Sequence, residues 1–503
     1  MKKTFYVLSI ASVCFLGNLY AAELEHLTQT ITTFEKYAAK AMKDWEVPGM
    51  AIAIVKDDKI VYAEGFGIKE MGSPDKIDPH TIFQIGSISK SFTAALVGME
   101  IDNKHLKWDD SVVNHLPDFR MNDPWVTRAF QIEDTLAQRS GLAEQSLDNL
   151  AALGSSRKEM IHALRYIKPV TSFRSAYAYQ NVFFLVASEI VELKTEKSWE
   201  QLIQERILTP LGMNETSVGE KPFINAKNVA WLHERGVDGK PLKREKPFPF
   251  MNWVYTYAPA GGINSNVLDM AKWIMMQSNL GQFEGKQIVS SENIQRMHRP
   301  HIFVASHGNI NNYYGLGWVY EPYSPYSITW HTGGTSGFST ILGFMPEERV
   351  GIVILTNEAN NNLPAALLHQ FFDLYTGKQD QDWSKQLLAE QKEQEVKLRE
   401  MLSKPVVDFS PALPLSAYAG TYHNEAFGEI QVVVEKDKLV LIAGKDKVKI
   451  PVIHFDRDIF TVVWPEMFLP GTEKIVFGLD SHGNVATLNA DLFGKDGNGL
   501  FVK

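Results

Sequence analysis

The chain has 503 residues, which suits about two to four domains at roughly 100–200 residues each. Hydrophobic residues make up 45% of it and charged residues 22%, so it is a folded globular protein and not a disordered one. Its 50 Lys and Arg are outnumbered by 59 Asp and Glu, and the formal charge is −9. This balance gives no general attraction to a phosphate backbone, and we expect no nucleic-acid partner.

The N-terminus has the pattern of a secretory signal peptide. Lys2 and Lys3 precede an apolar run at 5–16, and the small residues Ala21 and Ala22 follow. We expect residues 1–22 to be removed and the protein to be periplasmic or secreted in a bacterium. A membrane anchor is the alternative, although such a run is short for a bilayer span. No later apolar stretch approaches about 18 residues, so we expect no integral membrane span in the mature chain.

Metal and cysteine chemistry are not expected. The single cysteine, Cys14, lies in the leader, so the mature chain has no disulfide, thiolate ligand or cysteine nucleophile. The pair His233-Glu234 lacks the second histidine of a zinc-hydrolase motif, and Pro300 interrupts the histidines at 298 and 301. We therefore predict no metal and no cofactor.

The first elements of the body are a helix and two strands, and later strands return after a long helical region. Since strands stand at both ends with helices between them, we expect the outer segments to form one sheet and the middle a separate layer. The predicted helices are Thr28–Trp45, Ile88–Ile101, Val182–Leu193 and Trp199–Leu208, and the predicted strands are Met50–Val55, Lys59–Gly65, Ile82–Ile85, Tyr326–Trp330, Phe338–Met345 and Val350–Thr356.

The C-terminal part has a different sequence pattern. Residues 379–404 have helical periodicity and many charges, which indicates a connecting helix with a solvated face. Short alternating segments follow from Ile430 to Leu488, about ten residues apart, as in a small antiparallel barrel or sandwich. We expect domain limits of 23–378, 379–410 and 411–503.

The first candidate for chemistry is Ser87-Ile88-Ser89-Lys90, an S-x-x-K element. On a helix this spacing puts the hydroxyl and the amine on one face, one turn apart. The lysine can remove the serine proton only if neutral, and moving its pKa from about 10.4 to near 7 takes on the order of 4 kcal/mol of desolvation and nearby positive charge. An ordinary N-cap serine is the alternative. The sequence 155–158 has the same spacing, and we interpret it as a solvated turn.

Tyr179-Gln180-Asn181 is the second candidate, just before a predicted helix. A phenol directed at a serine can relay its proton to a leaving group, and the amide of Asn181 can bind a substrate carbonyl and a lysine. A buried tyrosine satisfied by backbone is the alternative. The same spacing at 422–424 lies in the C-terminal β segment and is assigned no catalytic role.

The third candidate is His331-Thr332-Gly333-Gly334, at the end of a predicted strand. Paired glycines let a substrate backbone lie against a strand, and a backbone N–H there can face that of Ser87 as an oxyanion hole. A structural histidine followed by a glycine turn is the alternative.

The three elements together resemble the β-lactamase and penicillin-binding-protein superfamily of serine hydrolases. The closest likeness is to its class C β-lactamase-related branch, which includes carboxypeptidases, esterases and D-amino-acid-specific peptidases. Gln84 stands where true class C β-lactamases usually have glutamate. The resemblance extends from Phe34 to Leu374, with further matches at Val47-Pro48-Gly49, Trp108-Asp109-Asp110, Ser140-Gly141-Leu142, Pro210-Leu211-Gly212-Met213, Ala260-Gly261-Gly262 and Tyr314-Gly315-Leu316-Gly317-Trp318.

The resemblance implies an α+β fold: an antiparallel sheet flanked by helices, an all-helical subdomain, and a C-terminal barrel similar to lipocalin-like domains. It implies that Ser87 is the acylated nucleophile and that Lys90 and Tyr179 act as base and acid. The N–H groups of Ser87 and Gly334 would form the oxyanion hole. The residues that would bind substrate are Asn181, His331, Thr332 and Gly333.

The expected substrates are small esters or peptides, including those with D-amino acids. A penicillin-binding or peptidoglycan-sensing acceptor that acylates with little turnover is the alternative, as is a weak β-lactamase. Relatives usually have K-T-G where this chain has His331, and a histidine of pKa about 6.5 is protonated in roughly a quarter of molecules at pH 7. We therefore expect weaker binding of substrate carboxylates and poor turnover of β-lactams. The sequence does not fix the oligomeric state.

Overall fold

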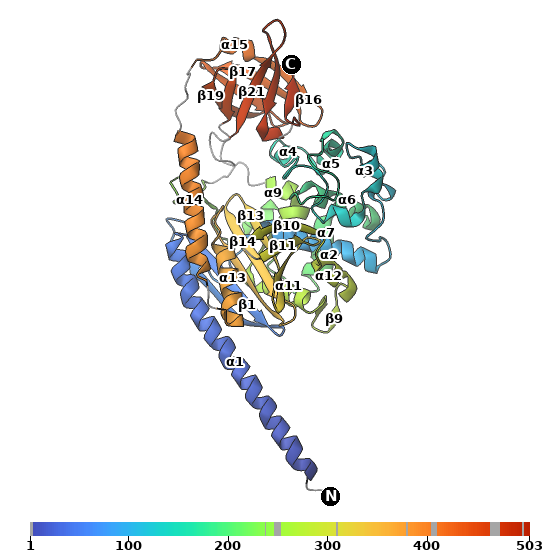
Figure 1. Ribbon diagram of the computed structural model, residues 1–503, viewed down its shortest axis with the longest axis vertical. Helices are drawn as coiled ribbons and strands as arrows, with labels where there is room; N and C mark the ends of the chain where they lie inside the picture. The colour runs from blue at the N-terminus through green and yellow to red at the C-terminus, as the bar shows by residue number, and fades with distance from the viewer. Residues whose placement is uncertain are drawn as a thin grey trace.

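The computed structural model describes residues 4–236, 238–245, 253–307, 310–378, 381–403, 410–462, 473–494 and 497–503. A mixed α/β body carries a separate barrel at one end, and helix α14 (Trp383–Ser403) and the C-terminal part of α1 (Thr4–Asp44) lie along its side (Figure 1). The expected α+β class with a C-terminal barrel is confirmed.

The body is built on one eight-stranded antiparallel sheet, which joins the two ends of the hydrolase-like region as expected. Strand β1 pairs with β15 through Met50 and Thr356 and with β2 on its other side. In spatial order the strands are β10 (Ile302–His307), β11 (Ile310–Tyr314), β12 (Val319–Tyr323), β13 (Tyr326–Thr335), β14 (Phe338–Met345), β15 (Val350–Thr356), β1 (Gly49–Lys56) and β2 (Lys59–Gly67).

Strand β1 shows why the sheet is covered on both faces. Its alternate side chains enter two different cores, Ala51 and Ala53 on one face and Ile52 and Ile54 on the other. Helices α2 (Ser89–Asp102) and α11 (Val267–Ser278) belong to the first core, while α1 (Thr4–Asp44) and α13 (Leu363–Thr376) belong to the second. The nucleophile candidate therefore begins a helix that is packed in the body's main core.

The part of the chain between strands β2 and β10 is mainly helical. It also contains the three-stranded sheet β3-β7-β4 and two hairpins, so short strands interrupt the expected all-helical subdomain. Its helices are α3 (Pro124–Ala129), α4 (Asn149–Ala152), α5 (Arg157–Ala163), α6 (Val182–Thr195), α7 (Trp199–Ile203), α8 (Glu220–Asn225), α9 (Trp253–Thr256), α10 (Ala258–Gly261) and α12 (Ser291–His298), and its strands are β3 (Phe83–Gln84), β4 (Ser217–Val218), β5 (His233–Arg235), β6 (Pro241–Lys243), β7 (Ile263–Ser265), β8 (Gln282–Phe283) and β9 (Lys286–Gln287).

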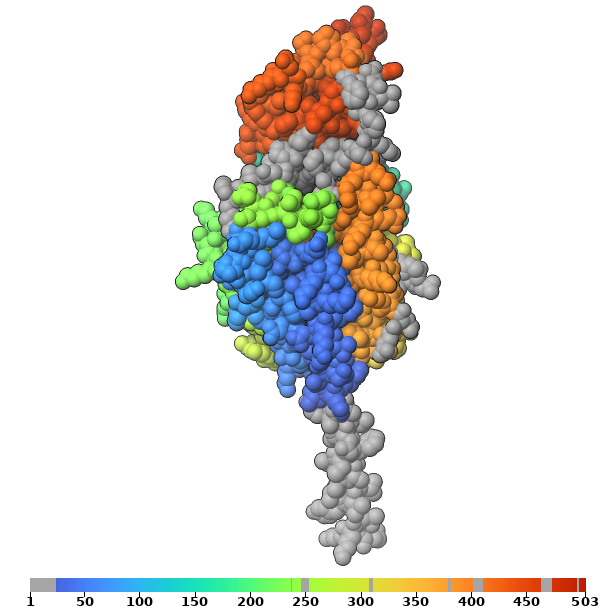
Figure 2. All heavy atoms as spheres, turned by 90° about the vertical axis from the view of Figure 1, so that its left-hand side faces the viewer, coloured from blue at the N-terminus to red at the C-terminus, as the bar shows by residue number. Residues whose placement is uncertain are grey.

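The connecting helix is α14 (Trp383–Ser403), whose charged residues are mostly exposed as expected, while its other face is packed. Trp45 of the segment after α1 donates to Ser384 at 2.9 Å, and Tyr37 donates to Asp382, just before α14, at 2.6 Å. Arg235 reaches Glu395 at 3.0 Å. Figure 2 shows α1 and α14 side by side on this face of the molecule.

The C-terminal domain is a closed antiparallel barrel, preceded by α15 (Leu415–Tyr418). Val432, Leu441, Ile450 and Phe477 point into its core. Strand β16 also pairs with β23, which closes the barrel. The strands are β16 (Gly420–Asn424), β17 (Gly428–Glu435), β18 (Lys438–Ala443), β19 (Val448–Asp456), β20 (Ile459–Val462), β21 (Lys474–Leu479), β22 (Val485–Ala490) and β23 (Leu500–Val502).

The first helix begins earlier than the sequence predicts. The expected helix starts at Thr28, whereas α1 runs without a break from Thr4 to Asp44, through most of the expected leader. Removal of residues 1–22 stays a prediction, and residues 1–3 lie outside the described part. Among the described residues no helix is long and apolar enough to cross a membrane.

Candidate active site

Ser87 stands in a short 3₁₀ turn, Gly86–Ile88, that leads directly into α2. Gly86 precedes it with a φ of +53°, in the left-handed region that favours glycine. A Cβ at Gly86 would lie 2.7 Å from the backbone nitrogen of Gly334, so a larger residue would push this turn away from β13. The side chain of Ser87 is not a helix cap, which removes the N-cap alternative.

Lys90 faces Ser87 from the next turn of the helix. Its Nζ donates to Ser87 Oγ at 3.1 Å, to Asn181 Oδ1 at 2.6 Å and to the Ala260 carbonyl at 3.0 Å. Lys90 is 0% exposed. Burial lowers the pKa of Lys90 to about 7, although the nearby Asp148 acts in the opposite direction. A large fraction of this amine is therefore a free base at neutral pH.

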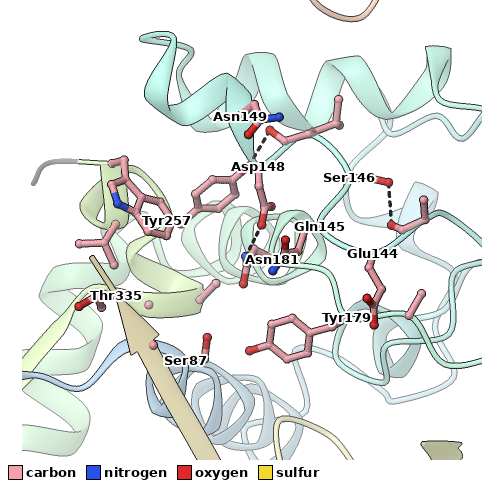
Figure 3. Close-up of a pocket in the computed structure, with 18 of the residues that line it drawn as sticks. Ser87, Glu144, Gln145, Ser146, Asp148, Asn149, Tyr179, Asn181, Tyr257 and Thr335 are labelled. Carbon is pink, nitrogen blue, oxygen red and sulfur yellow. Dashed lines mark hydrogen bonds between the residues drawn. The ribbon is translucent and has the colours of Figure 1, made fainter. Parts of the chain in front are cut away.

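Tyr179 and Asn181 approach the same pair from the loop before α6. The Tyr179 hydroxyl points toward Ser87 in Figure 3 and hydrogen-bonds with it. Its ring lies 4.6 Å from Lys90 Nζ. Burial raises the pKa of Tyr179 well above its usual range, so the phenol keeps its proton at neutral pH. The alternative of a tyrosine satisfied only by backbone is wrong.

The third sequence element lies within a strand and not after it. Strand β13 continues to Thr335, and Gly333 and Gly334 pair with Thr340 and Ser339 of β14. A Cβ on Gly333 would lie 1.9 Å from the Ile85 carbonyl oxygen, so the strand and the turn before Ser87 touch through bare backbone. A Cβ on Gly334 would meet no atom within 4 Å, which leaves Gly334 open to the cleft.

His331 is a neutral side chain in this structure. Its Nε2 hydrogen-bonds with the Tyr314 hydroxyl at 2.9 Å and its Nδ1 with the Thr332 carbonyl at 2.6 Å. Burial, followed by the charge of Lys90, lowers the pKa of His331 to about 3. The expectation that a quarter of molecules carry a protonated histidine here is therefore wrong, because His331 is only 2% exposed.

These residues surround one cleft of about 1060 Å³. Lys90 and Gly333 are not among the residues that line the cleft. The barrel contributes Leu492 and Phe493 to its lining. The predicted site residues that line the cleft directly are Ser87, Tyr179, Asn181, His331, Thr332 and Gly334.

The two repeated motifs do not form comparable sites. Ser156, and not Ser155, caps the N-terminus of α5, so the second S-x-x-K begins a helix and is not a free turn. Its Lys158 is 79% exposed and lies 3.4 Å from Glu189. Tyr422 lies in the barrel core and donates to the Tyr418 carbonyl at 2.6 Å. No group of three or more potential metal ligands occurs in the described ranges.

Asp148 is a functional candidate that no motif in the sequence marks. It lines the cleft, and its Oδ2 accepts a hydrogen bond from Asn181 Nδ2 at 2.7 Å. Nothing in the spacing around Leu147 and Asn149 indicates this contact, because Asp148 and Asn181 meet only through the tertiary fold.

Comparison with known proteins gives the family of the chain. Residues 34–371 match the Beta-lactamase family, and residues 404–498 match a domain of unknown function, DUF3471. The unguisins hydrolase ungD' of Aspergillus campestris is 27% identical over 88% of this chain and 86% of its own. Protein flp of Staphylococcus aureus is 26% identical over 64% of this chain and 62% of its own.

A solved structure shares the fold across nearly the whole chain. The octameric penicillin-binding protein homologue from Pyrococcus abyssi is 22% identical and superposes with a TM-score of 0.62, covering 94% of this chain and all of its own. The family match spans well over half of the 503 residues. The chain therefore belongs to the β-lactamase family, with a penicillin-binding-protein-like hydrolase fold.

Proposed function

We propose that the protein is a serine hydrolase that acts through an acyl-enzyme on Ser87. The observation that carries this proposal is the contact of 3.1 Å between Ser87 Oγ and Lys90 Nζ, an amine whose pKa burial lowers to about 7. A nucleophile beside a base that is neutral at working pH is the arrangement that acyl transfer requires.

Acylation begins when Ser87 Oγ bonds to the substrate carbonyl carbon and its proton passes to Lys90 Nζ. The carbonyl oxygen becomes an oxyanion, which accepts hydrogen bonds from the backbone N–H groups of Ser87 and Gly334. The contact between Gly86 and Gly334 supports this pairing, since it brings the two backbone segments together before substrate arrives.

The intermediate collapses when the bond to the leaving group breaks. The leaving group takes the proton held on Lys90, relayed by the phenol of Tyr179, whose raised pKa keeps it a proton donor. Water then attacks the acyl carbon and gives a proton to Lys90. The bond from that carbon to Ser87 Oγ breaks, the acid product leaves, and Lys90 returns the proton to Ser87. Asn181 accepts a hydrogen bond from Lys90 and binds substrate. His331, Thr332 and Gly333 belong to the part of β13 along which the substrate backbone binds.

The proposed substrates are small esters or peptide amides, including D-amino-acid peptides, that need no carboxylate contact. His331 is uncharged where a lysine would bind a carboxylate. The charged side chains that line the described part of the cleft are the acids Glu144, Asp148, Glu234, Glu473 and Asp491, with Arg244 in an ion pair with Glu234. A relative named a hydrolase supports turnover over simple binding.

Intact mass measurements with a panel of substrates test this function. We expect a fluorophosphonate to label Ser87, and neutral esters or D-amino-acid peptides to give a transient adduct with continuous product release. Loss of a charge-assisted hydrogen bond of about 1.5–3 kcal/mol predicts at least about tenfold lower kcat/KM for penicillins in the wild type than in a His331→Lys variant. A persistent adduct without release would instead identify an acceptor, and rapid penicillin destruction would contradict the substrate class.

The dependence of activity on pH is a second prediction. Because Lys90 accepts a proton only as a free amine, kcat/KM for a neutral ester should fall about tenfold per pH unit below an apparent pKa near 7 and level off above it. The apparent value belongs to Lys90 together with Asp148, since the two interact. Flat activity from pH 5 to pH 8 would be inconsistent with a neutral lysine base.

The proposed location is the periplasm or the exterior of a bacterium, supported by the charged and apolar pattern of the first 22 residues. We propose that the mature chain has its hydrolase domain at 23–378, a helical linker at 379–410 and the barrel at 411–503.

A further inference from the structure

Asp148 has an arrangement that the proposed chemistry does not by itself explain. Its Oδ2 accepts from Asn181 at 2.7 Å, and the Tyr257 hydroxyl also interacts with this buried carboxylate. Keeping a carboxylate out of solvent costs free energy even with such partners, so its position needs a reason.

The side chain of Asn181 stands between Asp148 and Lys90. Its Oδ1 accepts from Lys90 and its Nδ2 donates to Asp148. An ionised carboxylate only accepts, and a free amine whose lone pair faces Ser87 has two N–H groups for Asn181 Oδ1 and the Ala260 carbonyl, so the two neighbours together fix which way the amide is turned. Without the acceptor at Asp148 the amide could rotate and present its NH₂ group to Lys90, which would disturb the amine beside Ser87.

Neighbouring contacts hold Asp148 in place on both sides. The Tyr257 hydroxyl donates to the carbonyl of Leu147 at 2.9 Å. The Asn149 side chain donates to the carbonyl of Leu492 in the barrel. The carboxylate is thus carried on a segment fixed between the hydrolase domain and the barrel, and Figure 3 shows it directed at Asn181.

The tyrosines and the histidine around this pair are uncharged at neutral pH, and the acid Glu144 lines the same cleft. Burial raises the pKa of Tyr179, Tyr177 and Tyr257, and His331 is neutral. Burial also raises the pKa of Asp148 to about 7, with the hydrogen bond from Asn181 and the charge of Lys90 acting against it. Asp148 and Lys90 therefore titrate in the same pH range, and the charge of each affects the pKa of the other.

We propose that Asp148 is a positioning residue that orients Asn181 toward Lys90 and sets, through its charge, the pH at which Lys90 becomes the base. This inference rests on the proposed serine hydrolase function. A negative charge near an amine favours the protonated amine, so removing it lowers the pKa of Lys90 and raises its free-base fraction at low pH.

The test compares Asp148→Asn with Glu196→Gln, using the pH dependence of kcat/KM for p-nitrophenyl acetate. Asn keeps an acceptor oxygen and removes the charge, so we expect the acid limb to move at least about 0.5 pH unit lower with the plateau reduced less than about threefold. Glu196 is exposed at the far end of α6, and its variant makes the same charge change without moving the limb.

Two further variants separate charge from shape. Asp148→Glu keeps the charge and should restore the limb toward its original position. Asp148→Ala also loses the acceptor, so the acid limb should move to lower pH and the plateau of kcat/KM should fall at least about tenfold. This variant replaces Asp148→Asn in the test if the Asn variant does not fold. An unmoved limb in the neutral variants, with changes only in thermal stability, would overturn the inference. The proposed function itself fails separately, if wild-type activity does not depend on Ser87.

Discussion

Replacing Ser87 with alanine should abolish covalent labelling by a fluorophosphonate and lower ester turnover by at least about 10⁴-fold. Alanine offers no oxygen for the acyl bond, whereas the rest of the site is kept. Lys90 retains its bonds to Asn181 and to the Ala260 carbonyl, so the variant should fold with a melting temperature within about 3 °C of the wild type. Intact mass and initial rates give the first result, and calorimetry gives the second.

The second S-x-x-K of the chain supplies the matched control. Ser155→Ala removes the same hydroxyl from a motif of identical spacing, at the start of α5 and outside the cleft. We expect its labelling and rates to equal those of the wild type. Ester turnover that persists in Ser87→Ala and disappears in Ser155→Ala would refute the site, and turnover that persists in both would refute serine catalysis by this motif.

The sequence predicts the parts of this site that depend on local geometry. Ser87 and Lys90 meet because residues three apart share a helix face, and that needs no knowledge of the tertiary fold. The convergence of Tyr179 follows only from the family resemblance, since more than 80 residues separate it from Ser87. Asp148 has neither a local pattern nor a quoted motif, and it becomes visible only when α4 and α6 are placed together.

The same distinction applies to the fold. Strand β1 is predicted nearly to the residue, because its apolar run is bounded by Gly49 and by a turn. Strand β13 is predicted too short because paired glycines usually indicate a turn. In the structure Gly333 and Gly334 continue the strand, which packs against the Ile85 backbone. Strand β23 has three residues, too few for an alternating pattern, and only its pairing across the barrel defines it.

Replacing Lys90 with methionine should lower kcat/KM for a neutral ester by about 10³-fold, within the range that a positioned base contributes. Methionine fills the same unbranched volume but cannot accept the Ser87 proton. It also leaves Asn181 Oδ1 and the Ala260 carbonyl without their donor, so we expect a loss of unfolding free energy of about 1–3 kcal/mol for each such buried group.

The pH profile distinguishes loss of the base from simple damage to the fold. If Lys90 is the group that titrates near pH 7, the residual activity of Lys90→Met should no longer rise through that range. Lys158→Met is the matched control: that amine is 79% exposed, its surface ion pair contributes at most about 1 kcal/mol, and its rates and profile should not change. A Lys90→Met enzyme that keeps more than a tenth of its activity and the same acid limb would assign the base to another residue.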